Sequence, residues 1–141
     1  MPDRARRRRV AERAGWRCEY CRSPDWYSFS AFDLDHIFPS SRDGQPSDRN
    51  LAYSCGGCNN LKSDFIRGLD LQTNTIVPLF NPREHVWRDH FQWSVDGLRM
   101  EALTGIGRAT IRDLELNRDN LIRVRRLLIP AGEHPPPEDC E

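Results

Sequence analysis

Four of the five cysteines form two short pairs, Cys18-x2-Cys21 and Cys55-x2-Cys58, and this spacing constrains the fold more than any other sequence feature. A CxxC pair can point both sulfurs at one ion from a tight turn. Two such pairs supply the four thiolates that Zn²⁺ prefers in tetrahedral structural sites. The sequence therefore predicts a structural Zn²⁺ held by all four of these cysteines.

Disulfides and redox chemistry are the two other common uses of paired cysteines. Disulfides form in oxidising compartments, and the basic start of the chain, MPDRARRRRV, lacks the apolar core of a secretion signal. A redox motif would not explain two copies. The 33 residues between the pairs exceed the ~15–20 of a compact zinc ribbon, so we expect an inserted element there. The fifth cysteine, Cys140, is expected to be a spare exposed thiol.

Composition predicts a globular protein without a membrane span. The chain has 141 residues, of which 38% are hydrophobic and 30% charged, and this length suits one domain with an appended element. No apolar run approaches the ~20 residues that a membrane helix needs. We therefore expect a cytoplasmic protein with no membrane partner.

A net charge of zero conceals an uneven distribution of charge along the chain. Residues 1–17 carry seven arginines and two acidic residues, a net charge of +5, whereas residues 131–141 have a net charge of −4. An arginine-rich arm can grip a phosphate backbone, and we therefore assign Arg6, Arg7, Arg8 and Arg9 as candidate nucleic-acid-binding residues. The alternative is an ordinary solvated helix face.

The stretch between and around the cysteine pairs predicts a strand, a long loop, a second strand and a helix. AFDLDHIF and NLAYSC have the apolar pattern of strands, and SSRDGQPSDRN between them has loop composition. NNLKSDFIRG, which starts directly after Cys58, predicts a short helix with Leu61, Phe65 and Ile66 on its apolar face and Gly68 as its stop. Residues 4–17 predict another helix before the first cysteine pair.

The remainder of the chain predicts a hairpin followed by helices. HFQWSVDGLRMEAL alternates on both sides of an Asp-Gly turn, and residues 108–129 have helical periodicity in two pieces. We thus expect an α+β protein with four parts: a basic arm at 1–17, a zinc-stapled core at 18–68, an extension at 69–130 packed on the core, and a disordered acidic, Pro-rich tail at 131–141.

Four polar residues of the core form a candidate site for phosphodiester hydrolysis: Asp35, His36, Asn50 and Asn59. Hydrolysis needs a base that activates water and a cation that stabilises charge on the phosphate and leaving oxygen. His36 is the candidate base, since histidine titrates near neutral pH. Asp35 and the carbonyl of Asn59 could offer oxygens to Mg²⁺ or Mn²⁺, and Asn50 could orient the imidazole.

Lys62, the only lysine, lies three residues after Asn59, and on a helix it could hold the adjacent phosphate. Each of these residues also has an ordinary structural role. An Asp-His pair is common, a single histidine is often buried in a core, and Asn59 could simply cap the helix. Chemistry alone leaves the catalytic and the structural interpretation open.

As a set, these motifs resemble the HNH endonuclease family in its cysteine-bearing branch. The resemblance rests on Cys18-x2-Cys21, Leu34-Asp35-His36-Ile37-x-Pro39, Asn50-Leu51 and Cys55-x2-Cys58-Asn59-x2-Lys62. It implies a ββα-metal (His-Me finger) core with His36 as general base, Asp35 and Asn59 on the catalytic cation, Asn50 orienting the base and a structural zinc. The third signature position, often histidine, is Asn59 here, which gives an H-N-N variant.

The segment LFNPREHVWRDHFQW with LTGIGRAT resembles the C-terminal extension of many small stand-alone bacterial HNH proteins. It leaves His85 and His90 without an assigned role.

From these features we predict a metal-dependent endonuclease acting on double-stranded DNA, with 5′-phosphate and 3′-hydroxyl ends implied by the resemblance. A single finger makes one cut, so a double-strand break would need a homodimer or two binding events. The rival hypotheses are a non-catalytic zinc finger that binds nucleic acid and a subunit that binds a partner protein.

Overall fold

The computed structural model describes residues 4–40, 44 and 47–140, and the chain divides into two units between residues 66 and 67. Parts of the predicted arm (1–3), of the predicted loop (41–43 and 45–46) and of the predicted tail (141) lie outside the described residues. Each unit is described by itself below. Within the described part of the chain, none of the helices is long and apolar enough to cross a membrane.

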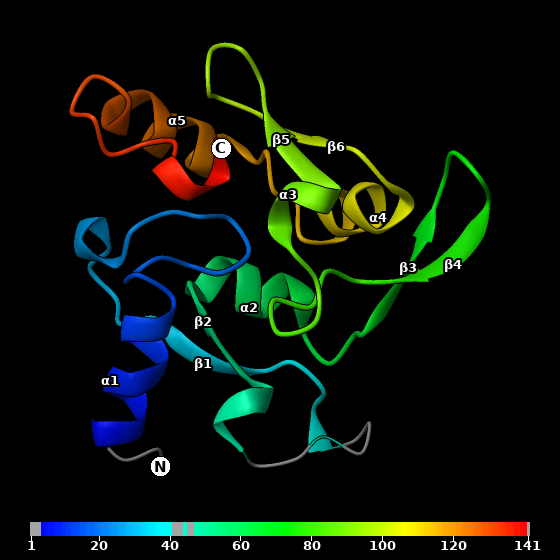
Figure 1. Ribbon diagram of the computed structural model, residues 1–141, viewed down its shortest axis with the longest axis horizontal. Coiled ribbons are helices and arrows are strands. Elements are labelled where there is room, and N and C mark those ends of the chain that lie inside the picture. Colours follow the sequence, from blue (N-terminus) through cyan, green and yellow to red (C-terminus); the bar gives the residue numbers. More distant parts are fainter. Residues whose placement is uncertain (1–3, 41–43, 45–46, 141) are drawn as a thin grey trace. The chain divides into compact units, whose positions relative to one another are not determined.

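The first unit is built on an antiparallel pair of strands, β1 (Asp33–His36) and β2 (Leu51–Ser54). In their register Asp35 lies opposite Ala52 and His36 lies opposite Leu51. Both strands confirm the sequence prediction. The helix α2 (Gly56–Lys62) follows β2 after a single residue and packs on β1 (Figure 1). This strand–strand–helix unit is the framework of the candidate site.

Helix α2 begins and ends earlier than predicted. The Cys55 sulfur accepts a hydrogen bond from the Cys58 N–H and so caps the helix inside the second cysteine pair. The helix ends at Lys62 because Ser63 adopts the left-handed region, with φ of 52°. Gly68, predicted as the helix stop, lies instead in the strand β3 (Arg67–Asp70), and Phe65, predicted to face the core, is 53% exposed.

Helix α1 (Arg4–Arg13) realises the predicted N-terminal helix, although it is shorter than residues 4–17. It packs against β2 and buries Val10 and Ala11. The core of the unit continues with Phe32 and Tyr53, whose ring centroids lie 5.1 Å apart. The described residues of the unit also include the 3₁₀ helices η1 (Asp25–Tyr27) and η3 (Asp48–Asn50). The arginine-rich segment is thus a folded helix docked on the core.

In its described residues, 67–140, the second unit contains two β-hairpins, three α-helices and one 3₁₀ helix. Its elements are β3 (Arg67–Asp70), β4 (Thr75–Pro78), α3 (Trp87–His90), β5 (Phe91–Trp93), β6 (Met100–Ala102), α4 (Gly105–Asp113) and α5 (Asp119–Leu128). The β5–β6 hairpin and the two helices α4 and α5 confirm the prediction for residues 90–129. The β3–β4 hairpin was not predicted. Asp70 anchors it by accepting hydrogen bonds from the Arg108 Nε at 2.8 Å and the Arg108 Nη2 at 2.9 Å.

The tail is ordered as far as residue 140, which corrects the prediction of disorder. His134 is buried, its ring centroid lies 4.4 Å from that of Trp93, and its Nε2 lies 2.9 Å from the Gly97 carbonyl oxygen. The Trp93 Nε1–H donates to Asp139 at 3.3 Å, and the last 3₁₀ helix, η4, spans Pro137–Asp139. The prolines reduce the entropy that this segment loses on ordering, so composition alone was a poor guide here.

His85 and His90 have packing roles in the second unit. The His85 Nδ1 accepts a hydrogen bond from the Asn81 N–H at 2.9 Å, and the His90 Nδ1 lies 2.7 Å from the Thr104 Oγ1. Their ring centroids are 5.2 Å apart. The Nδ1 of His85 is therefore occupied by a backbone donor of its own unit.

Gly107 gives a test of this packing. A Cβ at this position would overlap the carbonyl oxygen of His90 and meet the Ala102 Cβ at 3.2 Å. We expect Gly107→Ala to lower the free energy of unfolding by about 1–3 kcal/mol despite its better helix propensity, because a backbone atom cannot easily give way. The control is Gly105→Ala, whose Cβ would meet side-chain atoms and no backbone atom: the Asp70 Oδ2 at 2.8 Å and the Arg108 Nη2 at 3.7 Å. Urea unfolding in which Gly105→Ala proves the more damaging variant would contradict this packing.

Candidate metal centre and candidate active site

The four paired cysteines converge on one point. The sulfurs of Cys18, Cys21, Cys55 and Cys58 all lie within 4.8 Å of one another, and the Cys21 and Cys55 sulfurs are 3.8 Å apart. A tetrahedral Zn²⁺ with Zn–S bonds of about 2.3 Å separates its sulfur ligands by about 3.8 Å. All four side chains are buried. The donor set therefore fits a structural zinc-type ion, as predicted from the spacing.

The two pairs have matching local geometry. The Cys21 N–H donates to the Cys18 sulfur at 3.4 Å, and the Cys58 N–H donates to the Cys55 sulfur at 3.4 Å. Such N–H donors stabilise negative charge on sulfur. All five cysteines are free, so the disulfide alternative is not realised, and Cys140 is exposed as expected.

Electrostatics also favour a cation among these sulfurs. Burial raises the pKa of the Cys18 thiol well above its usual range, whereas hydrogen bonds, first of all from Cys18, lower the pKa of Cys21 well below its usual range. Buried thiolates this close repel one another unless a positive charge lies between them. A divalent ion removes this conflict and lets all four sulfurs bind as thiolates.

A second feature of the first unit is an open cavity of about 600 Å³ beside the end of β1. It is lined by Arg6, Arg7, Asp33, Leu34, His36, Leu51 and Asn59. Four elements supply these side chains: α1 supplies the arginines, β1 and β2 supply the strand residues, and α2 supplies the asparagine. The cavity thus brings a histidine, oxygen ligands and positive charge together.

Two of the predicted site residues, His36 and Asn59, line this cavity. His36 is exposed at the last position of β1. Asn59 lies on the first turns of α2, and its Nδ2 donates to the Asp33 carboxylate at 3.2 Å. Because a carboxylate can only accept, Asp33 fixes the amide with its nitrogen toward Asp33 and leaves the Asn59 carbonyl oxygen for another partner.

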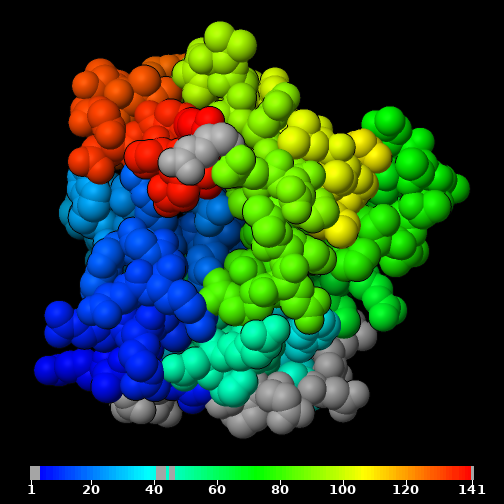
Figure 2. All heavy atoms as spheres, viewed as in Figure 1, coloured from blue at the N-terminus to red at the C-terminus, as the bar shows by residue number. Residues whose placement is uncertain are grey.

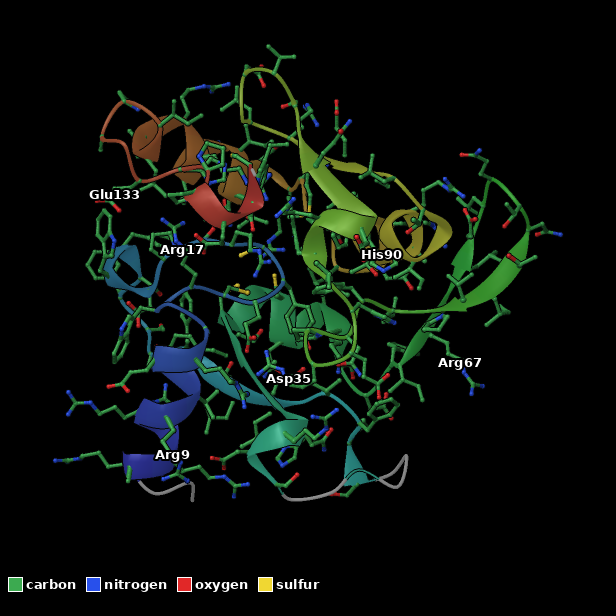
Figure 3. All side chains as sticks on the ribbon, viewed as in Figure 1. Arg9, Arg17, Asp35, Arg67, His90 and Glu133 are labelled. Carbon is green, nitrogen blue, oxygen red and sulfur yellow. The ribbon has the colours of Figure 1, made fainter. Side chains whose placement is uncertain are left out.

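Asp35, the predicted carboxylate ligand, is buried between β1 and α2 (Figure 3) and is only 4% exposed. Its Oδ2 accepts from the Tyr20 hydroxyl at 2.7 Å and lies 3.3 Å from the Lys62 Nζ. Burial raises the pKa of Asp35, and the charge of Lys62 opposes this rise. The cavity-lining residues that the structure describes include Asp33 and not Asp35.

Lys62 is placed differently from the prediction that it contacts a phosphate. It is 2% exposed, and its Nζ donates to the carbonyl oxygens of His36 at 3.4 Å and Ile37 at 3.2 Å in addition to pairing with Asp35. A buried ammonium requires such partners. In this conformation the lysine holds the end of β1 from inside.

Asn50 also acts on the backbone next to His36. Its Oδ1 accepts from the Phe38 N–H at 2.9 Å, its Nδ2 donates to the Phe38 carbonyl at 2.8 Å, and its own carbonyl accepts from the Ile37 N–H at 2.9 Å. These bonds fix the turn that follows β1. Asn50 therefore reaches the segment that carries His36 through main-chain atoms.

The arginines of α1, a helix that belongs to the dark blue segment in Figure 2, differ in their surroundings. Arg6 and Arg9 pair with Asp48 at 2.8 and 2.9 Å. The hydrogen bond from Arg9 lowers the pKa of Asp48 most, and the hydrogen bond from Arg6 lowers it further. Arg7 lines the cavity and donates to the Phe32 carbonyl. Arg8 pairs with Glu12 on the helix surface, with 74% of its side chain exposed.

Two residues of the site were missed by the sequence reasoning. Asp33 was treated only as part of a strand, although it stands two residues before Asp35 and shares its strand face. The sequence motifs did not indicate Tyr20, which lies between two predicted zinc ligands. The available signal was chemical: a buried tyrosine needs a partner for its hydroxyl.

Comparison with known proteins assigns a family to the first unit of the chain. The family model described as HNH endonuclease matches residues 18–65, a segment that contains both cysteine pairs and the four predicted site residues. This match confirms the resemblance drawn from the sequence motifs. Comparison with curated proteins and with solved structures gave no match. A domain of this family points to cleavage or binding of nucleic acid.

Proposed function

We propose that the HNH domain at residues 18–65 is the catalytic part of a metal-dependent endonuclease that hydrolyses DNA phosphodiester bonds. The observation that carries this proposal is the cavity in which His36 lies together with Asn59, Asp33 and two arginines of α1. A binding module needs positive charge, but it needs neither a base nor a cluster of oxygen ligands beside that charge.

His36 is the proposed general base. Its side chain is exposed at the cavity, so a water molecule and a phosphate can both reach it. The backbone that carries it is held on two sides, by the Lys62 ammonium on the carbonyls of His36 and Ile37 and by Asn50 on Phe38. An imidazole carried by a backbone held in this way can take the proton of an attacking water without a further change of the fold.

Asp35 and Asn59 are the proposed ligands of a divalent cation of the Mg²⁺ or Mn²⁺ type. Both donors that reach Asp35 bind its Oδ2, which leaves Oδ1 for a cation, and Asp33 leaves the Asn59 carbonyl oxygen available in the same way. Hard oxygen ligands suit these ions. When bound, such an ion neutralises charge that develops on the phosphate and on the leaving oxygen.

Arg7 and Arg6 are the proposed phosphate contacts at the cavity, whereas Arg8 and Arg9 contribute to the field of α1. We expect Arg7→Gln to weaken DNA binding and to reduce the slope of log K against log[salt] by about 0.9, because one phosphate contact is lost. The matched control is Arg8→Gln, which removes the same charge from an exposed side chain that pairs with Glu12 and is not among the described residues that line the cavity. Equal effects of the two changes in salt titrations would argue against a specific contact.

The proposal is tested by incubating zinc-loaded protein with supercoiled plasmid in Mg²⁺ or Mn²⁺, beside single-stranded DNA and RNA of the same sequence. We expect relaxed circles that form only with a divalent ion and that carry 5′-phosphate and 3′-hydroxyl ends. Linear product from a single encounter would indicate two cooperating copies. Retained DNA binding without cleavage of any substrate would favour the non-catalytic binding module.

A further inference from the structure

A buried polar trio connects the first cysteine pair to the strand that carries His36. Tyr20 is 1% exposed, Asp35 is 4% exposed and Lys62 is 2% exposed. The Tyr20 hydroxyl donates to the Asp35 Oδ2 at 2.7 Å, and the Lys62 Nζ lies 3.3 Å from the same oxygen. Three polar groups buried together in this way are costly unless each is satisfied.

The arrangement of the trio is asymmetric on the carboxylate. Both donors reach Oδ2, and among the described residues no hydrogen bond reaches Oδ1. A carboxylate held by two donors on one oxygen has little freedom to rotate about its terminal torsion, which is otherwise broad. The orientation of Oδ1 is thereby set by two buried groups, the Tyr20 hydroxyl and the Lys62 ammonium.

We propose that Tyr20 is a positioning residue for the catalytic cation: its hydroxyl holds Asp35 so that the second carboxylate oxygen is presented as a metal ligand. This inference rests on the proposed function, because it takes Asp35 as a ligand of that cation. Removal of a residue that hydrogen-bonds to a metal ligand commonly lowers metal affinity or activity by ~10–100-fold.

The position of Tyr20 in the chain gives this contact a wider consequence. Tyr20 lies between the metal-binding cysteines Cys18 and Cys21, so the structural ion fixes the backbone from which the tyrosine projects. The neighbouring residue Glu19 also binds β2, where its carboxylate accepts from the Tyr53 N–H at 2.8 Å. The first cysteine pair thus sets the geometry of Asp35 as well as stapling the fold.

The test compares Tyr20→Phe with Tyr53→Phe in zinc-loaded protein. Tyr53 is a matched control, since it is also buried and its hydroxyl donates to a different carboxylate, Asp25, at 2.6 Å. Each change removes one hydroxyl and keeps the ring. The primary readout is the dissociation constant of Mn²⁺, measured directly by the paramagnetic resonance signal of the free ion, together with zinc content and melting temperature.

We expect Tyr20→Phe to raise the Mn²⁺ dissociation constant about 10-fold and to keep its zinc, while Tyr53→Phe binds Mn²⁺ as the wild type does. Wild-type Mn²⁺ affinity in Tyr20→Phe would overturn the inference, and so would weakened affinity that is explained by loss of zinc. The plasmid assay distinguishes failure of the proposed function from failure of the proposed role of Tyr20. If the wild type binds Mn²⁺ but cleaves nothing, the proposed function fails, whereas normal cleavage with unchanged affinity in Tyr20→Phe removes only the role of Tyr20.

Discussion

Removal of the ion from the four-cysteine site is expected to unfold the first unit. Structural Zn²⁺ contributes about 10–16 kcal/mol of binding free energy in small zinc-binding peptides, which is as large as the whole free energy of unfolding of many domains, about 5–15 kcal/mol. Cys58→Ser should therefore abolish stoichiometric zinc binding and raise hydrogen exchange in peptides from residues 17–62. The physical reason is that four buried sulfurs within 4.8 Å of one another lose the charge that holds them together.

The chain supplies its own control for this experiment. Cys140 is an exposed cysteine outside the cluster, so Cys140→Ser should change neither the zinc content nor the exchange pattern. The second unit has a separate core around Phe80, Phe91 and Trp87, and its exchange should rise less than that of the first unit. Unchanged protection of residues 17–62 in the metal-free protein would show that the cysteine site is dispensable for the fold.

His36→Ala is expected to lower the rate of DNA cleavage by about 10²–10⁴-fold, the range for loss of a general base. His36 is exposed and its ring makes no contribution to the core, so the variant should keep its melting temperature, zinc content and DNA affinity. The measurement is the single-turnover rate of plasmid nicking at saturating protein. A parallel loss of DNA binding would instead indicate that His36 contacts the substrate without acting as a base.

The elements with the strongest local signals could be predicted from the sequence. The cysteine spacing predicted the metal cluster, and the alternation around Asp96-Gly97 predicted the β5–β6 hairpin. The end of α2 could not be predicted, because the apolar spacing of Leu61 and Phe65 suits a longer helix. It is the left-handed backbone at Ser63 that stops it. The β3–β4 hairpin depends on the contact of Asp70 with Arg108, 38 residues later, which no local pattern reveals.

The candidate site was predicted by residue type better than by position. His36 and Asn59 do share a cavity, as their chemistry suggested. Lys62 was predicted to face the phosphate because its helical spacing from Asn59 allows it. The structure turns the lysine inward, where the Asp35 carboxylate and two carbonyl oxygens hold it. Sequence spacing predicts which residues can lie close together, but it does not predict which of these side chains are buried and which are exposed to solvent.

The most direct test of His36 as the catalytic base is plasmid nicking by His36→Ala in Mg²⁺, with and without added imidazole. The cavity at position 36 is open, so a free imidazole can enter the space that the side chain leaves. We expect slow nicking without imidazole and a recovery that grows with the concentration of its neutral form, because the missing group is a base. Nicking by His36→Ala as fast as by the wild type, without imidazole, would contradict the assignment of His36 as the catalytic base.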